Sequence, residues 1–270
     1  MKNAIVKMIR IIYIIHLFGL IAGIKYFYYF EKMKGKDITH KDSGKGIRLK
    51  YDHHELIVRR DSTDLLLVES ILVGRFINKH WIGEYNQVEE YLKELPRDPV
   101  IVDAGANIGL FSRLILKKRP DAKIYAIEAE DNNYEVLKSN TNEYAVKTYG
   151  CGVWSKNCKL KVFPRDTGDW GFIVREIDGN DSSAIDAISL DSLINENSLN
   201  KIDLLKMDVE GSEFEIFGSD NLGWLELCRA VVIETHDHIV KGSEELVNKI
   251  LLDRGFIKCA YEENQLFIKK

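Results

Sequence analysis

Apolar and polar positions alternate in blocks along the last two thirds of the chain. Short apolar runs predict strands, and segments with apolar positions at helical spacing predict helices between them. Strand–helix alternation is typical of a doubly wound, mostly parallel α/β sheet. The predicted strands are residues 100–103, 123–128, 145–153, 159–163, 202–207 and 230–234, and the predicted helices are residues 110–118, 132–141, 214–217 and 243–254.

The last two apolar runs, at residues 256–260 and 265–269, are separated by only four residues. A connection this short predicts a hairpin, because a crossover between parallel strands needs a dozen residues or more. We therefore expect one antiparallel edge strand at the C-terminal end of the sheet.

Upstream of residue 100 the pattern is different. Loosely alternating β-formers predict short strands at residues 47–51 and 56–60, and helical spacing predicts helices at residues 65–76 and 88–95. We therefore divide the chain into an apolar, basic N-terminal helix, accessory strands and helices, and a ligand-binding α/β domain, at residues 1–36, 37–99 and 100–270.

The first 30 residues form the most apolar stretch of the chain, with a nearly unbroken run at residues 11–24. We favour a helix that packs on the domain or lies at an interface. A membrane-spanning helix needs about 20 apolar residues, and here it would have to include His16 and Lys25. A cleaved secretory signal needs a small-residue cleavage site, and no good one follows.

Composition narrows the classes of protein. With 45% hydrophobic and 30% charged residues and only 4 Pro, the chain is not disordered or of low complexity. Its net charge of −4 is divided unevenly, because residues 1–50 carry +8. We therefore expect no nucleic-acid partner, and peripheral membrane contact through residues 1–30. The 4 Cys form no Cys-x-x-Cys pair, which predicts reduced thiols and a cytoplasmic location.

The most specific motif is the turn from residue 103 to residue 109, where a buried strand passes into a helix. Gly105 permits a tight turn and close approach of a ligand, and Gly109 lets the helix pack on the strand. Asp103 ends the strand, and Asn107 stands where a dinucleotide-binding loop has glycine. The acidic opening favours a cationic ligand that carries ammonium and ribose groups.

Two further sites follow the next strands of the predicted sheet. Glu128 ends a strand 19 residues after Gly109, where a carboxylate can accept hydrogen bonds from a ribose diol. The segment 150–154 then offers backbone, and the ring of Trp154, against which an adenine can lie.

Ionisable residues gather at two later strand ends. Lys206, Asp208 and Glu210 alternate, so their side chains can project in one direction. Glu234 and His236 follow another strand, which places an acid and a potential base at the same sheet edge.

At these residues the sequence resembles the FkbM family of S-adenosylmethionine-dependent methyltransferases, from about Ile47 to the C-terminus. The similar blocks, in the family's order, are VIVDAGANIGLFS, IYAIEAE, ISLDSL, KIDLLKMDVEGSEFEIF and VVIETH, with RRDSTDLLLVESIL similar to its lead-in. The resemblance implies a class I methyltransferase (Rossmann-like) sheet of seven strands with a C-terminal antiparallel hairpin. It also implies O-methylation, often of sugars or natural-product hydroxyls. One departure is Ala129, because the family usually has Pro after the acid.

We expect the cofactor S-adenosyl-L-methionine to bind with its methionyl end on Asp103 and the glycine loop and its ribose on Glu128. The predicted cofactor-binding residues are Asp103, Gly105, Ala106, Asn107, Gly109, Glu128, Ala129, Gly152, Val153 and Asp208. The predicted catalytic residues are His236, Asp208, Glu210, Glu234 and Lys206.

Several points of mechanism stay open at this stage. The base that accepts the hydroxyl proton is His236 or Asp208, with Glu210 and Glu234 as orienting groups. Alternatively, Asp208, Glu210 and Glu234 hold Mg²⁺, which prefers oxygen ligands. The acceptor is a small-molecule or glycan hydroxyl, and residues 169–171 are a candidate acceptor loop.

Two alternatives share parts of this pattern. An NAD-dependent oxidoreductase has the same kind of glycine turn and ribose acid, but Asp103 and Asn107 argue against it. A non-catalytic, membrane-tethered scaffold with a methyltransferase fold has no need of so many charges at one sheet edge.

Overall fold

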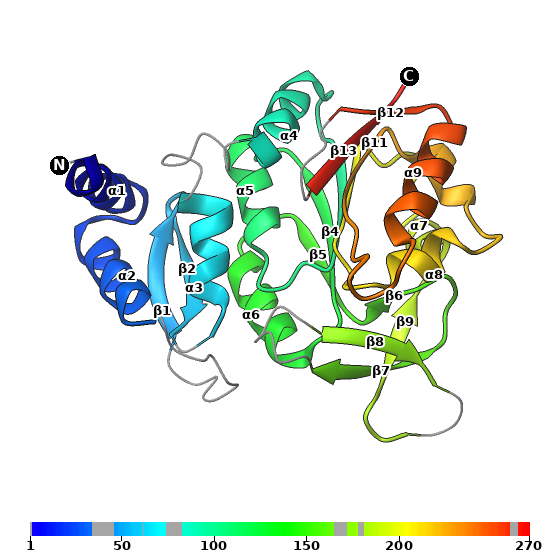
Figure 1. Cartoon of the computed structure of the whole chain (residues 1–270), viewed down its shortest axis with the longest axis horizontal. Helices are drawn as coiled ribbons and strands as arrows, with labels where there is room; N and C mark the ends of the chain where they lie inside the picture. The colour runs from blue at the N-terminus through cyan, green and yellow to red at the C-terminus, as the bar shows by residue number, and fades with distance from the viewer. Residues whose placement is uncertain are drawn as a thin grey trace.

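A seven-stranded sheet forms the centre of the computed structural model, which describes residues 2–33, 46–60, 62–73, 83–164, 172–177, 181–259 and 264–270. The strand order is β12-β13-β11-β10-β3-β4-β5 (Figure 1). Strand β13 pairs antiparallel with β11 and β12, and the other pairs are parallel. This confirms the predicted doubly wound sheet with a C-terminal hairpin. The strands are β3 (Val100–Ala104), β4 (Lys123–Glu128), β5 (Val146–Gly150), β10 (Leu204–Met207), β11 (Ala230–Glu234), β12 (Phe256–Lys258) and β13 (Asn264–Lys269).

Both faces of this sheet are covered, which explains the unbroken apolar runs of its strands. Ile101 belongs to one hydrophobic cluster and its neighbour Val102 to the other, because successive side chains point to opposite faces. One face is covered by α4 (Gly83–Glu94), α5 (Leu110–Lys118) and α6 (Asp131–Thr141). The other is covered by α7 (Leu190–Glu196), α8 (Glu213–Phe217), the 3₁₀-helix η3 (Gly223–Leu227) and α9 (Ser243–Asp253).

Residues 145–153, which were predicted to hold a third strand, hold β5 and also a second short strand. The chain changes sheets at Cys151, so that β5 ends at Gly150 and β6 (Gly152–Val153) joins a second sheet. That sheet has the order β6-β9-β7-β8, with β7 (Lys159–Pro164), β8 (Phe172–Glu176) and β9 (Ala184–Ile188). Only β7 among these three was expected from the sequence. Strands β8 and β9 alternate weakly between buried and exposed positions, which leaves little periodic signal.

The predicted accessory hairpin is confirmed. Strands β1 (Gly46–Tyr51) and β2 (His54–Arg59) pair antiparallel. The helix expected at 65–76 differs, since α3 (Asp64–Leu67) continues as a π-helix, η1 (Val68–Val73). The predicted helix at 88–95 lies mostly within α4.

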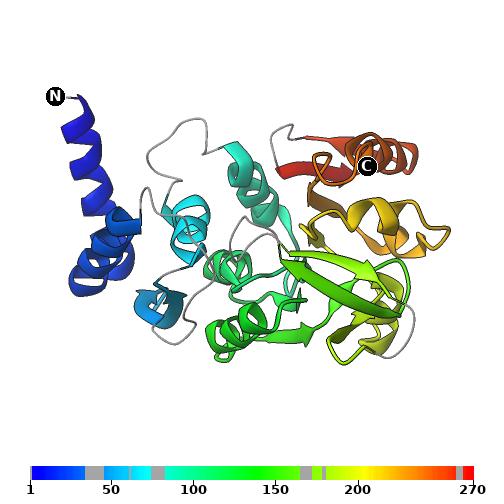
Figure 2. The same ribbon diagram turned by 60° about the horizontal axis from the view of Figure 1, so that its bottom comes forward.

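The expected single N-terminal helix is two helices. Gly19 has a φ of +82° and separates α1 (Lys2–Phe18) from α2 (Leu20–Met33). Their buried side chains, including Phe18 and Tyr26, share one hydrophobic cluster with β1, β2 and α3. Figure 2 shows this pair of helices beside β1 and β2, at the end of the molecule away from β12 and β13. Within the described ranges, no helix combines the length and apolar character needed to cross a membrane.

Polar side chains fix the accessory hairpin to the α/β domain. Arg113 of α5 is buried and donates to the carbonyl oxygens of Tyr51, Glu55 and Asn140. Asn140 of α6 bonds to both the N–H and the C=O of Ile57 in β2. The backbone groups of the hairpin turn and strand thus find partners across the interface.

Candidate active site

A cavity of about 570 Å³ lies at the carboxyl ends of β3, β4, β10 and β11, where sheets of this type bind ligands. Of the fourteen residues predicted for the site, two do not line the cavity, Asp103 and Gly109. The wall contains Gly105, Ala106, Asn107, Glu128, Ala129, Gly152, Val153, Lys206, Asp208, Glu210, Glu234 and His236.

The glycine loop follows β3 and forms one wall. Gly105 has a φ of +77°, and a Cβ at this position would overlap the carbonyl oxygen of Asp208. The N–H groups of Gly105 and Ala106 both donate to the carbonyl of Ile127, at 3.0 and 2.9 Å. Asn107 also has a left-handed backbone, with a φ of 49°. The loop is therefore held close to the ends of both neighbouring strands.

Asp103 lies beneath this loop instead of facing the cavity. Its side chain is fully buried, and its Oδ2 accepts a hydrogen bond of 2.7 Å from Ser112. Its Oδ1 has no hydrogen-bond partner among the described residues and is 3.7 Å from the Nζ of Lys206. Burial raises the pKa of Asp103, although the nearby Lys206 opposes the shift. The predicted direct contact between Asp103 and a ligand does not agree with this burial.

Lys206 connects the loop to the next part of the site. Its Nζ donates to the carbonyl of Gly105 at 2.7 Å and is 3.3 Å from a carboxylate oxygen of Asp208. Lys206 is nearly buried, and a buried charge needs nearby polar partners. The carbonyl of Gly105 and the carboxylate of Asp208 are those partners. It holds the loop from below while its side chain lines the cavity.

Gly109 has a structural role outside the cavity wall. Its φ is +84°, and a Cβ there would press against Leu137 of α6. This agrees with its predicted function of close packing, but not with direct cofactor contact.

Glu128 lies at the end of β4, and its carboxylate holds two backbone segments. It accepts hydrogen bonds from the N–H of Asn107 at 2.8 Å and of Glu130 at 3.0 Å. Burial raises its pKa, and these hydrogen bonds oppose the shift. Glu128 also lines the cavity.

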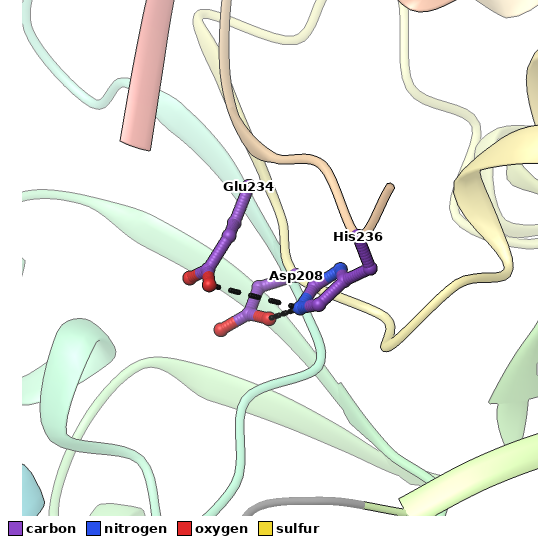
Figure 3. Close-up of side chains that lie close together, drawn as sticks. All are labelled: Asp208, Glu234 and His236. Carbon is purple, nitrogen blue, oxygen red and sulfur yellow. Dashed lines mark ion pairs between the residues drawn. The ribbon is translucent and has the colours of Figure 1, made fainter. Parts of the chain in front are cut away.

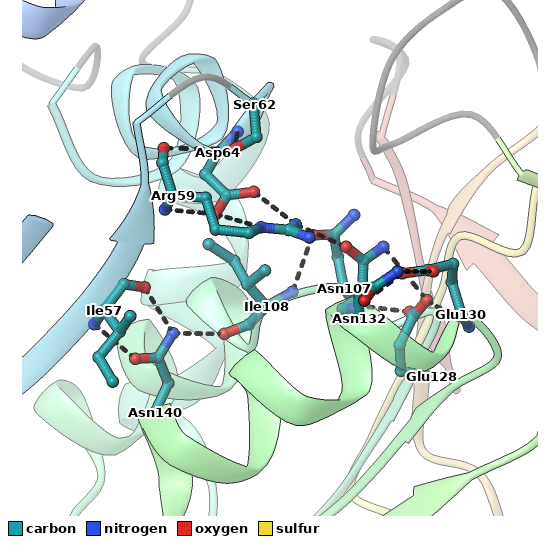
Figure 4. A network of polar contacts seen from close by, with 11 residues as sticks. Ile57, Arg59, Ser62, Asp64, Asn107, Ile108, Glu128, Glu130, Asn132 and Asn140 are labelled. Atoms are coloured by element: carbon teal, nitrogen blue, oxygen red, sulfur yellow. Dashed lines mark hydrogen bonds and ion pairs between the residues drawn. The ribbon is translucent and has the colours of Figure 1, made fainter. Parts of the chain in front are cut away.

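A polar network runs from Glu128 to the accessory region (Figure 4). Asn133 lies 3.4 Å from Glu128 and accepts a 2.6 Å hydrogen bond from Arg59. Arg59 also donates twice through its side chain to Asp64, at 2.7 and 2.9 Å. All of these side chains are buried. The sequence pattern carries no signal for this network, because its members come from four separate elements.

The segment after β5 forms the far wall. Cys151, Gly152 and Val153 line the cavity, whereas Trp154 lies in a small core cluster and not in the wall. The adenine contact expected from Trp154 does not agree with this placement. Phe172 and Val174 of β8 line the same cavity, and the candidate acceptor loop 169–171 lies outside the described residues.

Asp208, Glu234 and His236 converge at the ends of β10 and β11 (Figure 3). The Nε2 of His236 is 3.7 Å from an oxygen of Asp208 and 3.7 Å from one of Glu234. Glu210 is also 3.7 Å from Nε2 and has a left-handed backbone, with a φ of 51°. Such strained positions persist where the surroundings fix them, frequently at functional sites.

Glu213, which the predicted site omitted, supports His236 from behind. It begins α8, is fully buried, and lies 2.9 Å from the Nδ1 of His236. The N–H groups of Val209 and Gly211 also donate to it. The sequence shows that Glu213 belongs to the motif Asp208-Val-Glu-Gly-Ser-Glu213, but it does not show that the Glu213 side chain is buried.

The surroundings of His236 determine its charge. Burial lowers its pKa, but the hydrogen bond to Glu213 and the charges of Glu213, Asp208 and Glu210 outweigh burial and raise the pKa to about 9. His236 is therefore protonated at neutral pH in the ligand-free protein. This is the opposite of the neutral imidazole that a general base requires.

The remaining wall residues come from segments without a chemical motif. Leu67, Ser70 and Ile71 belong to α3 and η1, His238 comes from the loop after β11, and Asn264 begins β13. Their contribution depends on tertiary packing, and the sequence pattern carries no signal for it.

Comparison with known proteins agrees with this geometry. A family model described as the methyltransferase FkbM domain matches residues 103–258. The chain therefore belongs to the FkbM methyltransferase family, and it is a methyltransferase. Family membership favours this activity over the oxidoreductase alternative.

Curated relatives include methyltransferase sdnD of Sordaria araneosa, 34% identical over 200 residues that cover 61% of this chain and 76% of the relative. The hexuronic acid methyltransferase AglP of Haloferax volcanii is 27% identical, covering 67% and 75%. The 31-O-demethyl-FK506 methyltransferase FkbM of Streptomyces tacrolimicus is 26% identical, covering 64% and 78%. Among solved structures, a precorrin-6y C5,15-methyltransferase from Geobacter metallireducens matches with 13% identity and a TM-score of 0.40, covering 68% and 86%.

Proposed function

We propose that this methyltransferase uses S-adenosylmethionine to methylate a hydroxyl group of a sugar, glycan or other small metabolite. The observation that carries the proposal is one cavity that joins the glycine loop and Glu128 to the cluster of Asp208, Glu210, Glu234 and His236. Two relatives act, by their names, on a hexuronic acid and on an O-demethylated natural product, which supports a hydroxyl acceptor.

The residues of the cavity fit S-adenosylmethionine. The loop around Gly105 lets a ligand approach the backbone, and Glu128 offers carboxylate oxygens to a ribose diol. The backbone of 151–153 and the side chain of Ala129 provide a narrow wall for a flat base. When bound, the cofactor supplies a methyl group on a positively charged sulfur, and the acids at the strand ends favour that charge.

The chain's own residues position and activate the acceptor hydroxyl. As the oxygen–carbon bond to the methyl group forms, the carbon–sulfur bond breaks and the hydroxyl proton goes to a carboxylate of Asp208. Lys206 and protonated His236 hold Asp208 from two sides. The apolar walls at Ile108, Phe111 and Val153 exclude water from the line of transfer.

This function is tested by incubating the protein with methyl-labelled S-adenosylmethionine and a panel of hydroxylated sugars and metabolites. We expect label on an acceptor oxygen. The Asp208→Asn variant should lose turnover by about 10²–10⁴-fold, the usual contribution of a general base. Label found only on nitrogen or carbon would contradict the hydroxyl acceptor, and unchanged turnover in the variant would exclude Asp208 as the base.

We also propose that α1 and α2 rest on an anionic membrane surface. Ile21, Ile24 and Tyr28 follow helical spacing on α2 and are 73%, 55% and 59% exposed. Met8 and Ile12 on α1 are exposed as well. The net charge of +8 on the first 50 residues is complementary to anionic headgroups.

A further inference from the structure

We propose that Asp208, Glu234 and His236 bind a divalent first-row transition-metal cation at the acceptor end of the cavity. This inference deepens the proposed methyl transfer and rests on it for the role of the cation. The binding site itself is argued from the side chains alone.

The distances suit a single cation. One ligand atom from each of the three residues lies within 4.8 Å of the other two. The Nε2 of His236 is 3.7 Å from each of the two carboxylates. Ligand atoms bound at about 2.1 Å to one metal lie roughly 3–3.5 Å apart, so a small closure of the side chains completes the site.

The second observation is how His236 is held. It is 97% buried, and its Nδ1 lies 2.9 Å from Glu213, whose carboxylate is fixed by two backbone N–H groups. A carboxylate behind a histidine sets the ring orientation and directs the other nitrogen to a metal. Here the other nitrogen, Nε2, points into the group of acids, and the nearest carboxylates of the described residues are each 3.7 Å from it. A bound cation would replace the proton that Nε2 carries in the ligand-free protein.

The charge of the surroundings also favours a cation. Glu210 adds a third acid 3.7 Å from Nε2, and Glu213 a fourth on the opposite side of the ring. In the described part of the chain, the basic groups beside the cluster are Lys206, 3.3 Å from Asp208, and the neighbouring ring of His238. The acids outnumber them.

An imidazole ligand selects among cations. Mg²⁺ and Ca²⁺ prefer oxygen ligands alone, whereas Mn²⁺, Fe²⁺, Co²⁺ and Zn²⁺ accept a mixed set of nitrogen and oxygen. The site therefore differs from the Mg²⁺ site expected from the sequence in two respects. His236 replaces Glu210 as the third ligand, and a transition metal replaces Mg²⁺.

Such a cation would make a coordinated acceptor hydroxyl more acidic. With the cation bound, Asp208 would serve as a ligand instead of as the base, and the hydroxyl proton would pass to Glu210, which also lines the cavity. The bond changes of methyl transfer stay the same, and only the activation of the oxygen differs.

The test uses the full chain, stripped with a chelator and titrated with Mn²⁺ while the electron paramagnetic resonance signal of free Mn²⁺ is followed. We expect one Mn²⁺ per chain, loss of binding in His236→Ala, and retained binding in His238→Ala, which removes a neighbouring histidine of the same cavity. Glu213→Gln should weaken binding by about 10–100-fold, as expected when the group behind a histidine ligand is changed.

Circular dichroism of each variant verifies that it is folded. No binding to the wild-type chain, or equal binding to His236→Ala, would overturn the inference. Titration of the same samples with S-adenosylmethionine separates the two proposals. Cofactor binding without Mn²⁺ binding overturns only the metal site, and Mn²⁺ binding without cofactor binding overturns only the proposed function.

Discussion

At the scale of single residues, Gly105 shows how closely the loop and the ligand site depend on each other. Its left-handed backbone and the carbonyl of Asp208 leave no room for a side chain. Any larger residue must move the loop away from the end of β10, where Lys206 binds it. The shape of the cavity therefore depends on residue 105 having no Cβ atom.

We predict that Gly105→Ala weakens S-adenosylmethionine binding at least tenfold and lowers the free energy of unfolding by about 1–3 kcal/mol. Isothermal titration calorimetry and urea unfolding measure the two effects. Gly242→Ala is the matched control, since Gly242 also has a positive φ but lies in open space. Wild-type binding by Gly105→Ala would contradict this account of the loop.

Residue types and their order predicted much of the site, because the carboxyl ends of parallel strands meet at one edge. Gly105, Glu128, Asp208 and His236 were found in this way. The buried position of Asp103 could not be predicted in this way, since it depends on contacts with Ser112 and Lys206, which lie elsewhere in the sequence. The charge of His236 likewise depends on a buried partner, Glu213.

At the scale of elements, how fully a strand or helix is buried determines whether its apolar pattern predicts it. Strands covered on both faces have long apolar runs, and all the strands of the central sheet were predicted. Strands β8 and β9 and helix α7 lack such runs and were missed. The N-terminal helix was expected to be continuous, but Gly19 allows a left-handed turn that a periodicity argument does not detect.

The contact between the accessory hairpin and the α/β domain depends on Asn140, which bonds to Ile57 in β2 and to the carbonyl of Ile108 beside the cavity. We predict that Asn140→Ala lowers the free energy of unfolding by about 2–4 kcal/mol, because buried backbone groups lose their partners. Urea unfolding measures this. The exposed Asn142→Ala should change it by less than about 0.5 kcal/mol. Equal effects of the two substitutions would contradict the role of Asn140.

At the scale of the whole molecule, the charge is divided between a basic, apolar N-terminal end and an acidic body. The pair α1 and α2 also supports the cavity, because Arg10 and Tyr26 bond to Glu69 in η1, next to the wall residues Ser70 and Ile71. A surface that contacts α1 and α2 would therefore lie close to the elements that line the site.

We predict that the protein sediments with vesicles containing phosphatidylglycerol and not with vesicles of phosphatidylcholine alone. Raised salt should release it, since attraction to anionic headgroups is screened. The double substitution Ile21→Ser and Ile24→Ser should reduce binding, whereas Leu252→Ser, an exposed apolar residue of α9, should not. Equal binding to both kinds of vesicle, or to neither, would contradict the proposed membrane contact.

The most direct test of the central claim is calorimetric titration of the purified chain with S-adenosylmethionine. We predict one binding site, no binding of NAD, and an affinity reduced by about tenfold or more in Glu128→Gln, which loses charged hydrogen bonds worth roughly 1.5–3 kcal/mol. Glu135→Gln, on the exposed side of α6, should bind like the wild type. If well-folded wild-type protein does not bind S-adenosylmethionine, the proposed use of the cavity is wrong.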